Sequence, residues 1–227
     1  SDFRNDLDKD SNNERFFAGL PNIPKANKNG MSIYLLFIQH IIFSLNKERG
    51  RAAIVVPTGF ITAQSGIEKK IREALIERKM LRGVVSMPSN IFASTGTNVS
   101  VLFLDAKADS ENIVLVDASK LGETVKDGKN QRTVLTPEEE SRIVDAMNNK
   151  LPEDDFAVVV TSDEIKEKNY SLSAGQYFEV KIEYVDITPE EFAEKMNAYK
   201  TSLDALFAES HKLEEEIKKQ LGGLKYE

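Results

Sequence analysis

The chain has 227 residues, of which 41% are hydrophobic and 30% charged, and no stretch approaches the roughly 20 apolar residues of a membrane span. The absence of cysteine excludes disulfides and thiolate metal sites and is compatible with a reducing, cytoplasmic setting, and the two histidines lie too far apart in sequence to suggest a metal site. The net charge of −7 argues against a free-standing nucleic-acid binder, although a local basic patch or a basic partner would still bring DNA to it.

Residues 1–30 are polar and irregular, which predicts a loop. Lys25 and Lys28 lie in a basic, amide-rich run, which is typical of a solvated loop or of one that touches phosphate. Ser32 is suited to cap the next helix, predicted over residues 33–46. Apolar residues lie nearly all round that helix, so we expect it to be buried on most sides against a sheet. We interpret His40 as a core or edge histidine rather than a ligand.

Residues 51–56 form a continuous apolar run, which predicts a parallel strand covered on both faces. The strand ends at Pro57-Thr58-Gly59. Ligands of doubly wound sheets bind outside the carboxyl ends of the strands, so we expect this corner near a site. An amphipathic helix over residues 65–79 follows, and the order of elements indicates half of an α/β sheet.

We expect the domain to be organised around residues 81–105. Two short runs rich in β-branched residues, 83–87 and 99–104, predict an antiparallel strand pair. The intervening segment is too long for a tight hairpin and carries one bulky aromatic, Phe92. Long loops at strand ends often carry function. From the residues alone, Phe92 either packs into the core and anchors the loop, which is the ordinary fate of an aromatic, or serves a site.

Further strands are predicted over residues 113–117 and 156–160, with a polar loop and turn over 121–132 between them. Helices are predicted from Thr136 and over 161–168. Thr188 begins a long amphipathic helix that ends at Gly222-Gly223, and its apolar stripe must be covered either by its own domain or by a partner. We therefore predict three parts, residues 1–118, 119–187 and 188–227.

The sequence contains no evident nucleophile–base set and no acid cluster with metal-ligand spacing. It also lacks a Gly-x-Gly-x-x-Gly loop and a Gly-x-x-x-x-Gly-Lys phosphate-binding motif. An α/β sheet that opens with a helix lacks the strands and first turn where a nucleotide-type cofactor sits. We therefore expect that Ser1 is not the natural start of the protein.

Five segments occur in an order that is specific as a set: Phe37-Ile38-Gln39-His40, residues 50–59, residues 90–98, residues 128–138 and residues 165–177. This set resembles the modification (M) subunit of type I restriction–modification systems, an N6-adenine DNA methyltransferase. The resemblance implies the C-terminal half of a Rossmann-like methyltransferase sheet, ending in an antiparallel strand pair and followed by a mostly helical extension. The family's S-adenosylmethionine-binding Gly loop and Asn-Pro-Pro-Phe/Tyr motif would precede Ser1, so we expect a C-terminal fragment that is inactive by itself.

The resemblance also implies roles for single residues. In such methyltransferases the target adenine is flipped out of the duplex and stacks on an aromatic residue, and Phe92 matches that position. Ser32 and Phe37 match the helix that lies beside the adenine of the cofactor. The side chains expected to face the DNA backbone are Lys25, Lys28, Thr95, Thr97 and Asn98.

The implied reaction is methyl transfer from S-adenosylmethionine to the exocyclic amine of adenine, without a covalent intermediate. Sequence recognition would belong to a separate specificity subunit, a restriction subunit would complete the complex, and no membrane is involved. The helix over residues 188–222 is the candidate for docking the specificity subunit. Two alternatives stay open: a non-catalytic interaction module, and a full-length small-molecule enzyme with a pocket near Pro57 and Phe92.

Overall fold

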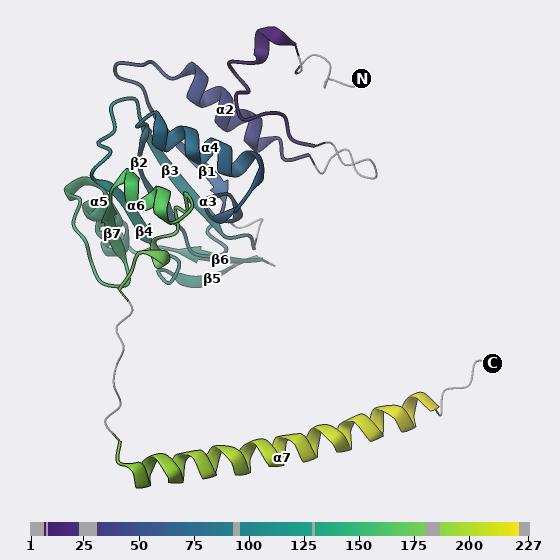
Figure 1. The fold of residues 1–227 in the computed structure, drawn as a ribbon. Coiled ribbons are helices and arrows are strands. Elements are labelled where there is room, and N and C mark those ends of the chain that lie inside the picture. Colours follow the sequence, from purple (N-terminus) through teal and green to yellow (C-terminus); the bar gives the residue numbers. More distant parts are fainter. Residues whose placement is uncertain are drawn as a thin grey trace. The chain divides into compact units, whose positions relative to one another are not determined.

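The computed structural model describes residues 7, 9–22, 31–92, 96–128, 130–179 and 187–222. The chain divides into two compact units, Ser1–Glu179 and Val180–Glu227. In their described parts, the first unit is an α/β domain and the second is one long helix (Figure 1). The boundary predicted after residue 118 lies inside the first unit and stays a prediction.

A five-stranded mixed sheet forms the centre of the first unit, in the order β1-β3-β2-β4-β7. Its strands are β1 (Arg51–Pro57), β2 (Leu81–Ser86), β3 (Val99–Asp105), β4 (Ile113–Asp117) and β7 (Ala157–Val160). β3 is antiparallel to both β1 and β2, β2 is parallel to β4, and β7 is antiparallel to β4. The predicted antiparallel pair of β2 and β3, the predicted strand β4 and the mixed α/β class are therefore confirmed.

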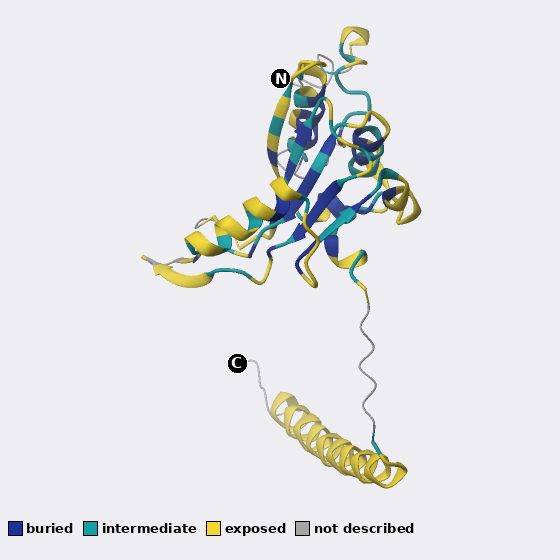
Figure 2. Cartoon of the chain, turned by 90° about the vertical axis from the view of Figure 1, so that its left-hand side faces the viewer, coloured by how far each residue is buried: buried dark blue, intermediate teal, exposed yellow. Residues whose placement is uncertain are grey.

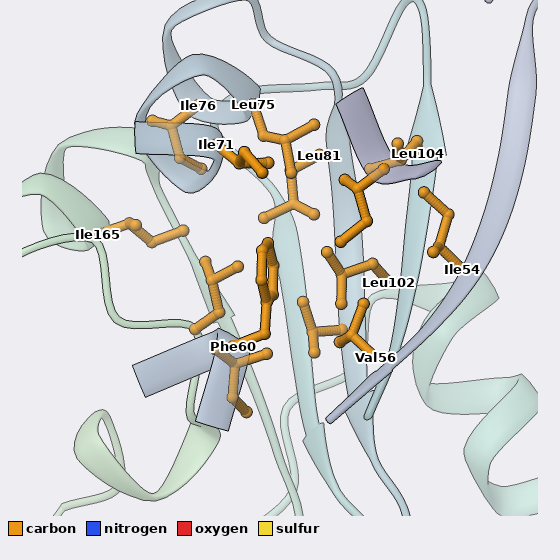
Figure 3. Close-up of a cluster of buried hydrophobic side chains, with 14 of the residues drawn as sticks. Ile54, Val56, Phe60, Ile71, Leu75, Ile76, Leu81, Leu102, Leu104 and Ile165 are labelled. Carbon is orange, nitrogen blue, oxygen red and sulfur yellow. The ribbon is translucent and has the colours of Figure 1, made fainter. Parts of the chain in front are cut away.

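Alternate residues of the central strands point into two hydrophobic clusters, one on each face of the sheet. Val84 and Leu115 join the larger cluster, whereas Val85 and Val116 join the smaller one. The larger cluster contains side chains from α2 (Tyr34–Ser44), α3 (Gly59–Thr62), α4 (Gly66–Glu77) and α6 (Ser162–Glu167). Phe60 of α3 lies in its middle (Figure 3). The opposite face is covered by α5 (Pro137–Asn149) through Ala146 and Met147.

The prediction for residues 51–56 is wrong in two respects. β1 is antiparallel, and within the described residues it pairs only with β3, so it is an edge strand. It is buried on one face only: Ile54 and Val56 are buried, whereas Val55 is exposed. A continuous apolar run does not reveal whether a second layer covers the strand, because coverage depends on distant segments.

Helix α2 is shorter and more exposed than the sequence predicts. It buries Leu35, Leu36, Ile38, Gln39 and Ile42, but Phe37 is 62% exposed. Ile33, Phe43 and His40 are exposed too, and Nδ1 of His40 lies 3.4 Å from the Ser44 hydroxyl. The expectation of burial on most sides is therefore wrong.

The segment predicted as a polar loop over residues 121–132 contains a β-hairpin instead. Strands β5 (Glu123–Asp127) and β6 (Asn130–Val134) are antiparallel, and Asp127 pairs with Asn130. Most of their described side chains are exposed, so the segment has no hydrophobic alternation by which a strand is recognised.

The helix-start signals at Thr136, Thr161 and Thr188 are confirmed in detail. Thr136 and Thr161 each form a capping box with a glutamate three residues later, at the starts of α5 and α6. Thr188 and Glu191 exchange the same two hydrogen bonds at the start of α7 (Pro189–Gly222). Two 3₁₀ turns, Asp10–Asn12 and Ala174–Gln176, complete the described elements. No helix in the described part of the chain is long and apolar enough to cross a membrane.

Candidate functional site

The loop between β2 and β3 is tied down at both ends. Asn90 adopts a left-handed φ of 55°, which asparagine tolerates well, and its carbonyl accepts a hydrogen bond of 2.9 Å from the Thr133 N–H of β6. The Thr133 hydroxyl donates to the Ser89 carbonyl at 2.7 Å. At the other end, the Asn98 carbonyl accepts from the Thr58 N–H at 3.1 Å. The loop therefore runs from the β5–β6 hairpin to the corner that follows β1.

Phe92 stands two residues after the anchored Asn90, and its side chain is 48% exposed. It belongs to neither hydrophobic cluster. The interpretation of Phe92 as a core anchor is therefore wrong. Hydrogen bonds at the two ends of the loop hold it in place instead. A half-exposed phenyl ring on an anchored loop leaves an apolar face available to a planar ligand.

The remaining residues predicted to face DNA fall into two groups. Thr97 and Asn98 are exposed at the end of the same loop, where a hydroxyl and an amide are suited to phosphate contacts. Thr95 lies outside the described residues, and so do Lys25 and Lys28.

The two residues predicted to lie beside the cofactor belong to the start of α2. Phe37 is exposed, whereas Ser32 is partly buried and precedes the helix. The prediction that Ser32 caps the helix is wrong: the N-cap is Ile33, without a side-chain hydrogen bond. The Ser32 carbonyl instead accepts from Leu35 N at 3.1 Å, because the first turn is tightened in the 3₁₀ manner.

Gln39 positions α2 and was not singled out from the sequence. It is fully buried, and its Oε1 accepts a 2.8 Å hydrogen bond from the Ala18 N–H. Its Nε2 donates to the carbonyls of Gly19 and Leu35, at 3.1 and 3.2 Å. Side chains two positions apart on an α-helix point about 200° away from each other. Because Gln39 points into the core, Phe37 points to the opposite, exposed side. The only signal in the sequence was its place within Phe37-Ile38-Gln39-His40.

Arg72 of α4 was also missed, and it holds the corner after β1. Its side chain is fully buried, and its guanidinium donates to the carbonyls of Phe60, Ala63 and Tyr170, the last at 2.7 Å. The Leu172 N–H donates to the Ile61 carbonyl at 3.0 Å. Residues 165–177, which carry part of the resemblance, therefore fold back on this corner. A lone arginine on an amphipathic helix looks like a surface residue in the sequence.

The corner adjoins both groups of predicted site residues. The Tyr34 ring of α2 meets the Phe60 ring edge-on, with 6.4 Å between the ring centroids. Thr58, at the start of the corner, bonds to Asn98 in the loop of Phe92. The structure thus joins α2 and the β2–β3 loop through residues 58–62, where the sequence placed a site.

Burial is the largest cause of the pKa shifts of Arg72, Tyr34 and Tyr177. Burial lowers the pKa of Arg72 to about 10, so the side chain stays charged at pH 7. Burial, together with Glu68, raises the pKa of Tyr34 to about 12, and burial also raises the pKa of Tyr177, so both phenols stay protonated. The described residues contain no cluster of three or more acidic or histidine side chains placed to hold a metal ion. The arrangement offers a stacking surface and hydrogen-bonding groups.

Comparison with known proteins gives concordant matches. A family model described as N-6 DNA Methylase matches residues 2–185. The MpnII methylase subunit of a type I restriction enzyme from Mycoplasma pneumoniae is 33% identical over 177 residues, which cover 74% of this chain and 32% of that protein. The HindI methylase subunit of a type I restriction enzyme from Haemophilus influenzae is 30% identical over 220 residues, which cover 94% of this chain and 47% of that protein.

A solved structure also matches the fold. The crystal structure of the type I restriction-modification system methyltransferase subunit from Streptococcus thermophilus has a TM-score of 0.62 and 27% identity, over 79% of this chain and 35% of that one. The chain thus spans less than half the length of each of these relatives.

Proposed function

The chain belongs to the N-6 DNA methylase family, and from this premise we propose that it is the C-terminal part of a type I restriction–modification methyltransferase subunit. The proposed reaction transfers a methyl group from S-adenosylmethionine to N6 of adenine in DNA. The observation that supports it most is the half-exposed Phe92 on a loop anchored at Asn90 and Asn98. This is the position that matches the residue which stacks on a flipped base.

Phe92 receives the target adenine in this proposal. A flipped base loses its stacking in the duplex, and an exposed aromatic ring replaces part of that energy. The hydrogen bonds of Thr133 and Thr58 fix the two ends of the loop, so less freedom is lost when the base binds. Thr97 and Asn98, together with Thr95, Lys25 and Lys28, contact the sugar–phosphate backbone.

S-adenosylmethionine would supply the methyl group. Phe37 fits its adenine ring, because 62% of the side chain is exposed on a helix held in place by Gln39. Ser32, at the entrance to the same helix, is the adjacent polar contact. The Gly loop and the Asn-Pro-Pro motif of the family do not occur in the 227 residues. We therefore propose that this chain alone binds the cofactor weakly and does not methylate.

The proposed partners are DNA, a specificity subunit and a restriction subunit, in the cytoplasm. The net charge of −7 supports a separate DNA-recognising subunit, because an acidic chain repels DNA and needs a partner that binds it. Helix α7, which buries none of its side chains, is the proposed element for assembly with the specificity subunit. The same helix is the observation that favours the second candidate, a non-catalytic interaction module.

The coding sequence upstream of the Ser1 codon separates the two candidates. An Asn-Pro-Pro-Phe or Asn-Pro-Pro-Tyr motif, with a Gly-rich loop before it, is expected for the methyltransferase. The polypeptide containing both parts, with its specificity subunit, should transfer labelled methyl groups from S-adenosylmethionine to duplex DNA as N6-methyladenine. A start codon at this position, or absence of the product, would favour the interaction module.

A further inference from the structure

Helix α7 carries an apolar stripe with a period different from that of an ordinary surface helix. The helix has 34 residues, and the large hydrophobic side chains of the stripe are about half exposed or more (Figure 2). The steps along the stripe alternate between four and three residues, and the positions are Phe192, Met196, Tyr199, Leu203, Leu206, Ser210, Leu213 and Ile217. An alternation of three and four is the heptad pattern of a left-handed coiled coil. We call these eight positions the seam.

The charged residues beside the seam are segregated along the helix. Lys195 and Lys200 flank its first half, whereas Glu209, Glu214 and Glu216 flank its second half. Charges at these flanking positions set the partner and the orientation of a coiled coil. A helix that is basic at one end of its seam and acidic at the other complements a reversed copy of itself.

We propose that α7 pairs with α7 of a second copy of this chain as an antiparallel coiled coil. One register matches the whole seam: Phe192 lies opposite Ile217 of the second copy, Met196 opposite Leu213, Tyr199 opposite Ser210, and Leu203 opposite Leu206. In this register the small Ser210 faces the large Tyr199, so the one polar position of the seam meets a side chain with its own hydroxyl.

The flanking charges select the antiparallel arrangement. In the stated register, Lys195 lies beside Glu216 of the second copy, and two-fold symmetry makes this contact twice. In a parallel pair, Lys195 would lie beside Lys200 and Glu209 beside Glu214. Both are like-charge contacts, which disfavour the parallel pair.

The pairing goes beyond the proposed function and does not depend on it, because it rests on α7 alone. The pairing of two α7 helices also leaves apolar side chains to which a specificity subunit is able to bind. Phe207 and Leu221, which are 61% and 62% exposed, lie next to the seam rather than within it. A helix of another subunit is able to pack against them on the side of the pair.

The first test is the oligomeric state of the full chain by sedimentation. We expect a dimer, and we expect Leu206→Glu, at the centre of the seam, to yield a monomer. The matched control is Ala208→Glu, which adds the same charge on the side facing away from the seam and should leave the dimer intact. A monomeric parent chain, with α7 folded back or awaiting a specificity subunit, would overturn the proposal. So would a dimer that is insensitive to Leu206→Glu.

Charge reversal tests the flanks without removing any apolar side chain. Glu216→Lys should weaken the dimer about tenfold, because two attractive contacts become repulsive. Adding Lys195→Glu to the same chain should restore it. Glu215→Lys, one residue away on the outer side, is the control and should have little effect. Equal effects of Glu215→Lys and Glu216→Lys would contradict the register.

Disulfide cross-linking determines the orientation, since the chain has no cysteine of its own. An affinity-tagged Tyr199→Cys chain is mixed with an untagged Ser210→Cys chain and oxidised. The antiparallel register predicts a cross-linked dimer in the mixture and none in either chain alone. Cross-linking of Ser210→Cys with itself would indicate a parallel pair and refute the arrangement.

Discussion

Phe92→Ala is predicted to lower methyl transfer much more than it lowers stability. The variant is to be assayed in a polypeptide that carries the upstream segment expected from the resemblance. Full burial of a phenylalanine contributes about 1.5–3 kcal/mol to folding. Because the side chain of Phe92 is 48% exposed, its removal should lower the free energy of unfolding by only about 1 kcal/mol.

The expected loss of activity is larger. Stacking of a base on an aromatic ring contributes about 1–3 kcal/mol, so the rate of methyl transfer should fall by about 5- to 150-fold. The assay measures incorporation of labelled methyl groups into duplex DNA, beside urea unfolding of the same preparations. Phe92→Tyr keeps an aromatic face and should retain most of the activity.

Phe43→Ala is the matched control. Phe43 lies on α2 and is 46% exposed, so its truncation should cost about the same stability as that of Phe92. Its methyl transfer should be unchanged. If both variants show the same shift in unfolding and neither loses activity, Phe92 is a structural side chain and the stacking argument fails.

Three further outcomes follow from the structure. Arg72→Met removes the donor from one buried and two partly buried carbonyl groups, which should lower the free energy of unfolding in urea by about 3 kcal/mol once the recovered desolvation of the charge is counted. A loss below about 1 kcal/mol would contradict this role. The hydrogen bond from Lys150, together with the Glu111 N–H, lowers the pKa of Asp109 to about 2 from its ordinary 3.8. The ionised carboxylate therefore stabilises the fold above pH 4, and this contribution should disappear between about pH 4 and pH 2. Asp109→Asn should flatten unfolding free energies measured across that range, and an unchanged slope would refute the assignment. Deletion of residues 188–227 should abolish co-purification with a specificity subunit while the first unit stays folded; retained co-purification would disprove the docking role.

The features that the sequence predicts well are local ones. The capping boxes at Thr136 and Thr161 each need only a threonine and a glutamate three residues later, and both form. β4 matches its predicted bounds, because its apolar run is short and bordered by polar residues on both sides. α7 begins at the predicted Thr188 signal and ends at Gly222, because its start needs only a threonine and a glutamate three residues later.

The features that the sequence fails to predict depend on distant segments. The apolar run of β1 predicts a strand covered on both faces, yet only one face is buried, because coverage depends on which distant segments pack against the sheet. Thr133 is buried, but the other described side chains of strands β5 and β6 are exposed, so no hydrophobic alternation marks these strands in the sequence. Arg72 is recognised as a buried side chain only when the carbonyl groups that it binds, up to 98 residues away, are in place.

At the candidate site, too, local features are predictable from the sequence and features that depend on distant segments are not. Phe92 stood out because it is the one bulky aromatic in a long polar loop, which is visible in the sequence. Its exposure was not visible, since a loop can be held either by an aromatic anchor or by backbone hydrogen bonds. Here Thr133 and Thr58 supply those bonds from two other parts of the chain. Gln39 was overlooked because a buried amide is identified only by its partners, Ala18 and Gly19.

Four of the five segments that carry the resemblance meet around a single corner, and the fifth, residues 128–138, contacts the loop of Phe92 through Thr133. The helix of Phe37 reaches it through Tyr34, and the loop of Phe92 reaches it through Asn98. Residues 165–177 reach it through Leu172 and the carbonyl bonded to Arg72. The contacts at this corner that need particular side chains are the guanidinium of Arg72 and the rings of Tyr34 and Phe60. The bonds of Thr58 to Asn98 and of Leu172 to Ile61 join backbone groups and do not depend on which side chains stand there.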